Sequence, residues 1–351
     1  MKRYRIASIP GDGIGGEVLE SAQAVLKAVG QRHGFAIEFD PYPWSCAYYL
    51  EHGRMMPENG LEILKPYDAI FLGAVGFPGV PDHVSLWGLL IPIRRGFDQY
   101  ACVRPAKLLP GVKSPLALRP GAEIDYVVVR ENTEGEYSTI GGRIYQDTPH
   151  EVVSQVAVFT RRGCERIIRY AFELAKAKGK TRVTSATKSN GIIHSMPFWD
   201  EVFWGVAREY PQLESEQMHI DALAAKLVLA PERFGVVVGS NLFGDILTDL
   251  SAATVGSIGI GASANLNPER AHPSMFEPVH GSAPDIVGRG IANPLGAVWS
   301  GAMMLEHLGE VEAAGQLEQA IARVLTSGVR TPDLGGTAST IDVTQSLLDL
   351  P

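Results

Sequence analysis

Two aspartates stand four residues apart in an otherwise apolar stretch, NLFGDILTDL at residues 241–250. In a helix, positions i and i+4 share a face, so Asp245 and Asp249 would repel each other by roughly 0.2–0.5 kcal/mol. Burial would raise that cost, because an unpaired carboxylate is expensive to remove from water. The spacing therefore predicts a positive charge between the two side chains.

Other stretches place polar side chains at the ends of apolar, strand-like runs, which is where ligands bind in open α/β sheets. Taken singly, each of these residues is ordinarily a solvated charge or a packing residue. Their combination, with several basic groups, a tyrosine and aspartates, instead favours a ligand-binding site. The residues are Arg94, Arg95, Arg104, Arg130, Tyr137, Lys188, Asn190 and Asp221.

Composition excludes several classes of function. The net charge of −8 argues against general affinity for nucleic acid or an anionic membrane surface, so an anionic ligand needs locally placed basic groups. The three cysteines, Cys46, Cys102 and Cys164, are widely spaced and match neither a disulfide framework nor a zinc pattern. With no signal-peptide core and no membrane-length apolar run, we expect a cytoplasmic protein.

Apolar runs that alternate with helix-like segments predict an α/β fold with a largely parallel sheet. The clearest helix is expected over residues 160–178, where apolar side chains recur at helical spacing. Residues 141–162 hold two extended segments without a helix between them, which predicts a protruding antiparallel arm. A length of 351 residues favours two domains. The strand-like runs lie at 5–9, 67–76, 124–130, 181–188 and 234–241.

The segment GDGIGG at residues 11–16 matches the dinucleotide-binding pattern G-x-G-x-x-G literally. Pro10 interrupts the turn from strand to loop, and Asp12 would place a carboxylate where a pyrophosphate approaches the backbone amides. We therefore interpret the segment as a tight glycine-rich turn between a strand and a helix, and not as a Rossmann fingerprint.

The chain resembles the β-decarboxylating dehydrogenases, the family of isopropylmalate, isocitrate, homoisocitrate and tartrate/D-malate dehydrogenases. The most specific matches are SNLFGDILTDLSA and FEPVHGSAPDIVGRGIANP, and the resemblance runs from IPGDGIGGEV to GTASTIDVTQSLL. It implies an isopropylmalate dehydrogenase-like two-domain fold, distinct from a Rossmann fold, with a cleft between the domains. Residues 1–102 plus 256–351 would bind the cofactor. Residues 103–255 would bind substrate and metal and form the dimer, with the arm at 141–162 as its clasp.

The resemblance also implies a divalent cation, Mn²⁺ or Mg²⁺, bound by Asp245 and Asp249 together with Asp221 of the partner subunit. Such ions prefer ligands that are all oxygen, and the cation would offset the repulsion between the two aspartates. It would act as a Lewis acid on the 2-hydroxyl oxygen and stabilise the enolate left by decarboxylation. The sequence does not decide between the two ions or whether K⁺ assists.

Shared sites of this kind imply an obligate homodimer. Mixing Asp221→Ala chains with Lys188→Ala chains is then expected to restore some sites.

The catalytic groups carried over from the family are Lys188, which accepts the hydroxyl proton, and Tyr137, which delivers a proton to the enol carbon. Arg94, Arg104 and Arg130 match the family's clamp for the substrate carboxylates.

The stretch EPVHGSAPDI resembles the family's adenosine-binding loop. Asp285 stands where NAD-using members carry a carboxylate for the ribose hydroxyls, and it would repel the 2′-phosphate of NADP, so NAD is the expected cofactor. The residues matched to cofactor binding are Ile14, Asn190, Glu277, His280, Gly281, Ser282, Ala283, Asp285 and Asn293.

The substrate is expected to be small, because Trp87 lies near the place where isopropylmalate enzymes carry an acidic residue and would fill space. PWSCAYYLEHG and DHVSLWG are most similar to the tartrate and D-malate branch. That branch takes D-malate to pyruvate and CO₂, and tartrate to oxaloglycolate. The sequence does not rank these substrates.

Several alternatives remain open. An isocitrate-type activity is favoured by RENTEGEY and by Ser85, although no Asn accompanies that serine. An isopropylmalate-type activity is a second alternative, and a non-catalytic regulatory subunit is a third. The fourth is a metal-independent Rossmann-type 2-hydroxyacid dehydrogenase that uses residues 11–16.

Overall fold

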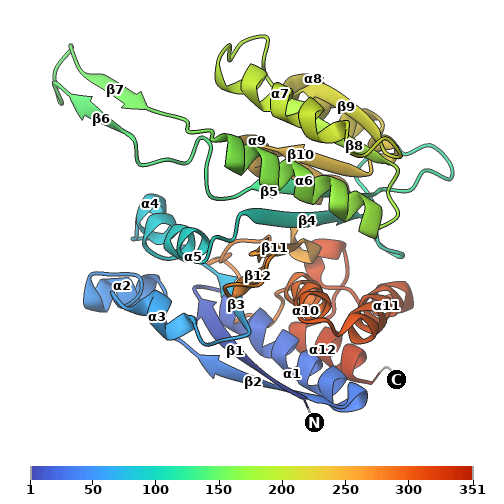
Figure 1. Cartoon of the computed structure of the whole chain (residues 1–351). Coiled ribbons are helices and arrows are strands. Elements are labelled where there is room, and N and C mark those ends of the chain that lie inside the picture. The colour runs from blue at the N-terminus through green and yellow to red at the C-terminus, as the bar shows by residue number, and fades with distance from the viewer. Residues whose placement is uncertain (1, 350–351) are drawn as a thin grey trace. The chain divides into compact units, whose positions relative to one another are not determined.

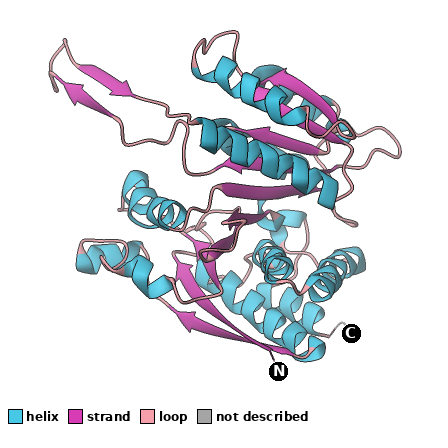
Figure 2. Ribbon diagram, in the orientation of Figure 1, coloured by secondary structure: helices cyan, strands magenta, loops and turns pink. Residues whose placement is uncertain are grey.

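The computed structural model describes residues 2–349, and the chain divides into two compact units. Unit 1 comprises the chain up to Gln99, Arg104–Pro120, and the chain from Ala252 onward, whereas unit 2 comprises Tyr100–Val103 and Gly121–Ser251. Strands alternate with helices in both units (Figures 1 and 2), so the α/β class predicted from the sequence is confirmed.

In unit 1, neighbouring strands follow the order β2-β1-β3-β12-β11. Strand β1 pairs in parallel with β2 and β3, and β3 pairs in parallel with β12, whereas β11 and β12 are antiparallel. Helices α1 and α10 pack against these strands (Figure 1). The bounds are β1 Lys2–Gly11, α1 Gly15–His33, β2 Phe35–Pro41, α2 Cys46–His52, α3 Gly60–Leu64, β3 Ala69–Ala74, α4 Asp82–Ser85, η1 Leu86–Leu90, α5 Ile91–Gly96, η3 Ile258–Ile260, β11 Ala262–Leu266, β12 Ser274–Pro278, α10 Leu295–Leu308, α11 Val311–Ser327, η4 Pro332–Leu334 and α12 Thr340–Leu348.

Unit 2 has the parallel strand order β5-β10-β8-β9. Strand β10 is wholly buried, as expected for an inner strand of a parallel sheet that is covered on both faces. Strand β4, Ala101–Lys107, contributes residues to both units. The bounds are β5 Asp125–Glu131, β6 Gly141–Ile144, β7 Val152–Gln155, α6 Arg161–Ala177, β8 Arg182–Thr187, α7 Ser195–Ala207, β9 Glu214–His219, α8 Ile220–Leu229, η2 Pro231–Arg233, β10 Val236–Gly239 and α9 Asn241–Thr254.

Helix α6 forms where the apolar periodicity predicts it. The Thr160 side chain caps its first turn by accepting a hydrogen bond from the Gly163 amide at 3.0 Å. The apolar face then packs against β5 and β10. Its buried residues are Cys164, Ile167, Ile168, Ala171, Phe172 and Ala175.

The predicted arm is an antiparallel hairpin of β6 and β7, with Gly141 opposite Gln155 and Ile144 opposite Val152. In unit 2 it extends away from the strands and helices that surround α6 (Figures 1 and 2). Every residue of its two strands is exposed. Over residues 2–349, no helix combines the length and the apolar character needed to cross a membrane.

Candidate active site

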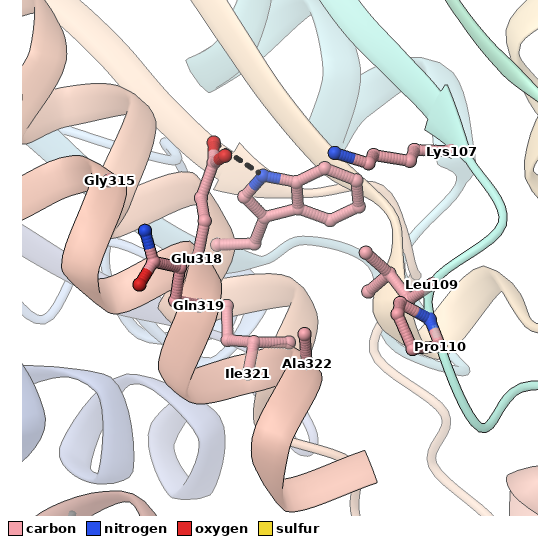
Figure 3. Close-up of a pocket in the computed structure, with 9 residues that line it drawn as sticks. Lys107, Leu109, Pro110, Gly315, Glu318, Gln319, Ile321 and Ala322 are labelled. Carbon is pink, nitrogen blue, oxygen red and sulfur yellow. Dashed lines mark hydrogen bonds between the residues drawn. The ribbon is translucent and has the colours of Figure 1, made fainter. Parts of the chain in front are cut away.

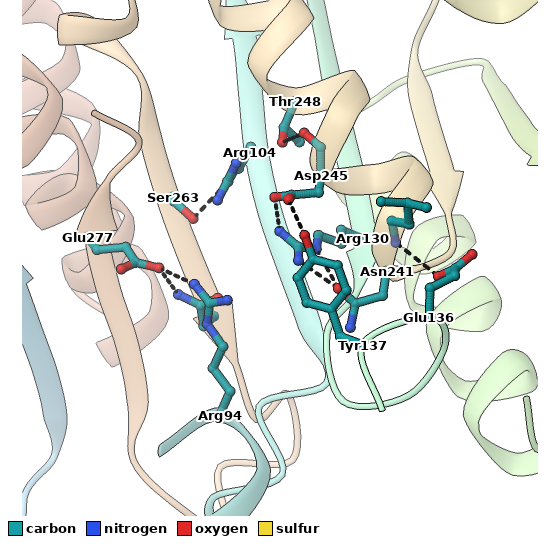
Figure 4. Close-up of polar contacts among 12 residues, drawn as sticks. Arg94, Arg104, Arg130, Glu136, Tyr137, Asn241, Asp245, Thr248, Ser263 and Glu277 are labelled. Carbon is teal, nitrogen blue, oxygen red and sulfur yellow. Dashed lines mark hydrogen bonds and ion pairs between the residues drawn. The ribbon is translucent and has the colours of Figure 1, made fainter. Parts of the chain in front are cut away.

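Arg130 at the end of β5 is the centre of a polar cluster in unit 2 (Figure 4). The residue is only 2% exposed, and its guanidinium donates to Asn241 Oδ1 from Nε at 3.0 Å and from Nη2 at 2.6 Å. Its Nη1 forms an ion pair with Asp245 on α9. Gly244 permits this approach, because a Cβ there would lie 2.5 Å from Arg130 Cβ.

Tyr137 completes this cluster. Its hydroxyl donates to Asp245 Oδ2 at 2.8 Å, and the Arg130 guanidinium lies 5.4 Å from the centre of its ring. Arg130 thus supplies a positive charge at Asp245, whereas a cation between Asp245 and Asp249 stays a prediction. Asp249, one turn further along α9, is exposed.

Three carboxylates hold the loop that joins Arg130 to Tyr137, and sequence analysis missed their role. Glu131 is buried and accepts from the amides of its own loop. Glu134 accepts from the Thr160 amide at 2.9 Å, and Glu136 accepts from the Leu242 amide at 3.0 Å. The loop is thereby tied to the first turns of α6 and α9. Burial raises the pKa of Glu131 to about 7.

Lys188 and Asp221 form a second polar group in unit 2. They follow β8 and β9, whose parallel register sets Thr187 opposite His219. Lys188 Nζ donates to Asp221 Oδ1 at 2.8 Å, and this hydrogen bond holds the pKa of the Asp221 carboxyl below its ordinary value. Asp221 is well exposed, with 68% of its side chain accessible. The Lys188–Asp221 pair is therefore formed within one chain.

In unit 1, Arg94 pairs with Glu277 at 2.8 Å (Figure 4), and both side chains are less than a tenth exposed. Asn265 Nδ2 also donates to Glu277 Oε1 at 2.8 Å. Arg94 Nε is buried and has no hydrogen-bond partner among the described residues. Arg104 Nε lies 3.3 Å from Ser263 Oγ. The sequence assigned Arg94 to the substrate and Glu277 to the cofactor, and the structure brings the two into contact.

The glycine-rich turn packs against the predicted adenosine-binding loop within unit 1. The Ile14 amide donates to the Ser282 carbonyl at 2.9 Å, and a Cβ on Gly13 would lie 2.0 Å from that oxygen. The Asp12 carboxylate accepts from the amides of Cys46 and Gly76. The Ile14 amide and the Asp12 carboxylate therefore already have hydrogen-bond partners. This agrees with the interpretation of residues 11–16 as a glycine-rich turn and not as a Rossmann fingerprint.

The predicted cofactor loop keeps polar groups available. His280 Nε2 is buried without a hydrogen-bond partner in the described chain, and burial lowers the pKa of this imidazole. Gly281 and Asp285 are exposed, whereas Ala283 has a positive φ of 40°. Asn293 is buried and donates to Asp333 Oδ2 at 3.0 Å. Asn190, the remaining predicted cofactor residue, is exposed in unit 2.

A π-helical turn, Leu86–Leu90, contains the segment expected to select the substrate. Turns of this kind occur frequently at functional sites. Trp87 stacks on Arg95, whose guanidinium lies 5.1 Å from the ring centre. The Ser85 hydroxyl is buried and donates to the Asp82 carbonyl at 3.0 Å. Ser85 therefore has a partner within its own helical segment.

Among residues 2–349, no group of three or more His, Cys, Asp and Glu side chains is placed to hold a metal ion. The metal hypothesis places only Asp245 and Asp249 on one chain, so the third ligand is expected from a second copy.

A hollow of about 360 Å³ in unit 1 is lined by Trp299, Leu109 and Pro110, with Glu318 accepting from the indole (Figure 3). None of the predicted site residues lines it.

Comparison with known proteins identifies the class. A model of the isocitrate/isopropylmalate dehydrogenase family matches residues 5–349, so the chain belongs to this family, as its motifs predicted. The isopropylmalate dehydrogenase-like fold is confirmed by a crystal structure of isocitrate dehydrogenase from Methylococcus capsulatus. The two have a TM-score of 0.89 and 35% identity, over 99% of this chain and 98% of that one.

Two relatives are more similar in sequence. D-malate dehydrogenase [decarboxylating] from Escherichia coli strain K12 is 55% identical over 99% of this chain and 98% of its own length. Tartrate dehydrogenase/decarboxylase from Pseudomonas putida is 56% identical over 99% of this chain and 97% of its own. The resemblance to the tartrate and D-malate branch is thus confirmed.

Proposed function

We propose that this protein is an NAD- and divalent-metal-dependent dehydrogenase of small 2-hydroxy dicarboxylates. Its reactions would be the oxidative decarboxylation of D-malate to pyruvate and CO₂ and the oxidation of tartrate to oxaloglycolate. The observation that carries this proposal is the identity of 55–56%, over 99% of the chain, with enzymes named for these two substrates.

Isocitrate- and isopropylmalate-type activities are the competing hypotheses. An isocitrate-type activity is disfavoured because the Ser85 hydroxyl, which would have to bind the additional carboxylate, already donates to the Asp82 carbonyl. Against the second, Trp87 occupies the π-helical turn and stacks on Arg95. We expect D-malate or a tartrate to give the highest kcat/KM in a panel of 2-hydroxy diacids. Isopropylmalate or isocitrate emerging as the best substrate would reject the assignment.

The proposed site orients a dicarboxylate through Arg94, Arg104 and Arg130. Arg130 is already held rigidly by Asn241 and Asp245, so little side-chain freedom is lost when it binds a substrate. The unpartnered Nε of buried Arg94 is a donor available for a carboxylate. We therefore expect this set of donors to favour substrates with two carboxylates.

Proton transfers are assigned to two residues. The 2-hydroxyl proton passes to the lone pair of the unprotonated Nζ of Lys188 as C2 is oxidised. The C3–C4 bond then breaks, CO₂ leaves, and its bonding electrons remain on C3 and the C2 oxygen as an enolate. Tyr137 donates a proton to C3, which yields pyruvate. The contact of the Tyr137 hydroxyl with Asp245 fixes the orientation of this proton donor.

The donor set fits a divalent cation, because Asp245 and Asp249 offer only oxygen atoms and lie one helical turn apart. Together with Asp221 of the partner subunit they would hold Mn²⁺ or Mg²⁺. When bound, the cation supplies Lewis-acid stabilisation of negative charge on the C2 oxygen.

The loop that begins at Glu277 fits a dinucleotide. It has a buried imidazole nitrogen without a partner, an exposed glycine and an exposed carboxylate, Asp285. NAD held by this loop would supply the acceptor for the hydride that leaves C2. Asp285 would accept hydrogen bonds from the ribose hydroxyls and would repel a 2′-phosphate.

Replacing Asp285→Lys together with Ile286→Tyr should therefore change cofactor preference. We expect the ratio of kcat/KM for NADP to that for NAD to rise by at least about 100-fold, because juxtaposed like charges cost several kcal/mol. Steady-state kinetics with both cofactors measure this ratio. Glu312→Lys, a charge reversal on the exposed surface of the same unit, is the control. An unchanged preference in the double variant would remove Asp285 from this role.

A homodimer is supported by exposed apolar side chains in unit 2, which would be costly to leave in water. On the arm these include Ile144, Tyr145, Val152 and Val153, each more than half exposed. A reducing compartment such as the cytoplasm suits a chain whose three cysteines are buried and form no disulfide within residues 2–349.

The contact between Lys188 and Asp221 changes the complementation expected from the sequence. If Asp221 belongs to the active site of the partner subunit, Lys188 of the same chain must belong to that site too. A mixed dimer of Asp221→Ala and Lys188→Ala chains would then contain no intact site. Lys188→Met and Tyr137→Phe chains should do so, with about a quarter of sites intact after random pairing. Pyruvate formation by chains mixed after unfolding and refolding measures this. Recovery in the first mixture but not in the second would contradict the proposed sharing.

A further inference from the structure

A second hollow in unit 1, of about 360 Å³, lies at the opposite ends of the strands from the predicted cofactor loop. Tyr67 and Asp68 directly precede β3, and His272 and Pro273 directly precede β12. These strands run in parallel, with Ala69 opposite Ser274, so their starts meet at one edge of the sheet. At their far ends, β3 pairs with the start of the glycine-rich turn, Ala74 opposite Gly11, and β12 leads into the 277–294 loop. The hollow, called here the β3–β12 hollow, is therefore separate from the proposed active site.

Basic groups dominate its lining. Lys65 and Arg270 carry the positive charge, His272 and His307 add imidazoles, and Asp68 is the single acid among the lining residues. The Asp68 carboxylate already accepts from the Arg5 amide at 2.7 Å. Over residues 2–349, the Lys65 ammonium and the Arg270 guanidinium have neither a hydrogen-bond nor an ion-pair partner. In a chain of net charge −8, such a local excess of positive charge attracts anions.

Two histidines line the hollow with the cations. His272 Nδ1 is buried and has no hydrogen-bond partner in the described part of the chain, which is a costly arrangement unless a ligand or water reaches it. His307 is half-buried at the end of α10, and burial together with the positive charge of Arg270 lowers the pKa of its imidazole to about 4. The positive charge of Arg270 therefore reaches an imidazole that lines the hollow.

We propose that the β3–β12 hollow binds a small polyvalent oxyanion, either a phosphate group or a polycarboxylate. Its volume lies at the lower end of the range for small-molecule sites. Lys65 and Arg270 supply charge, and His272 Nδ1 supplies a buried polar contact. This site goes beyond the proposed dehydrogenase activity and does not depend on it.

Calorimetric titration of the full-length protein with inorganic phosphate, and separately with tricarballylate, tests this inference. We expect one anion or both to bind the wild type at one additional site per chain. The double variant Lys65→Gln, Arg270→Gln should weaken that binding by roughly tenfold or more, since two charged contacts are lost. Binding of phosphate alone, tricarballylate alone or both would assign the ligand class.

The control variant is Arg323→Gln, which removes a positive charge from an exposed position of the same unit that does not line the hollow. It should bind both anions as the wild type does, and all variants should keep wild-type thermal stability and dehydrogenase turnover without added anion. The proposal would be overturned if the wild type bound neither anion, or if Arg323→Gln weakened binding equally. It would also fail if the double variant changed only the sedimentation coefficient, because the surface would then be a contact between copies.

Discussion

Lys188→Met is expected to lower kcat for D-malate by about 10²- to 10⁴-fold, the usual contribution of a positioned general base. Methionine retains the length of the side chain but cannot accept the hydroxyl proton. The folded protein should survive the change, since the pair with Asp221 is exposed to solvent and contributes at most about 1 kcal/mol. Steady-state kinetics and thermal unfolding measure the two effects separately.

A matched control for this variant is Lys176→Met, the same replacement at an exposed position on α6. It should retain wild-type turnover. If Lys188→Met also retained it, another group would have to accept the proton, and the assignment of Lys188 would be lost.

Removal of divalent cations with EDTA is expected to lower D-malate oxidation by about 10³-fold or more. A Lewis acid at the developing oxyanion is worth several kcal/mol, and each 1.4 kcal/mol corresponds to a tenfold change in rate. The fold should persist, because Arg130 and Tyr137 both contact the Asp245 carboxylate directly. NADH formation before chelation, after chelation and after addition of Mn²⁺ measures the effect.

The same experiment separates the proposal from a metal-independent Rossmann-type dehydrogenase. That alternative predicts full activity in EDTA. It also needs amides of the 11–16 turn for a pyrophosphate, whereas the Ile14 amide already donates to Ser282.

Much of the fold could be predicted because its signals are local. Helix α6 follows from apolar residues at helical spacing, such as Ile167, Ala171 and Phe172. Strands β5 and β10 follow from buried valine runs bounded by polar residues. The β6–β7 hairpin follows from two extended segments without an intervening helix. Each of these features depends on neighbours within about twenty residues along the chain.

The contacts within the candidate site were harder to foresee, because they join residues far apart in sequence. Lys188 meets Asp221 through the parallel register of β8 and β9, and Arg94 meets Glu277 across 183 positions. The family motifs named all four residues but not their pairing. Glu131, Glu134 and Glu136 were missed because acidic residues in a loop are ordinarily solvated, although their density in RENTEGEY was a usable signal.

The most direct test follows the carbon that should leave. D-malate labelled at C4, incubated with the purified protein, NAD and Mn²⁺, should release the label as CO₂ in amounts equal to the NADH and the unlabelled pyruvate formed. Retention of the label in a four-carbon oxo acid that does not decarboxylate, or absence of NADH while isopropylmalate or isocitrate is oxidised, would contradict the account.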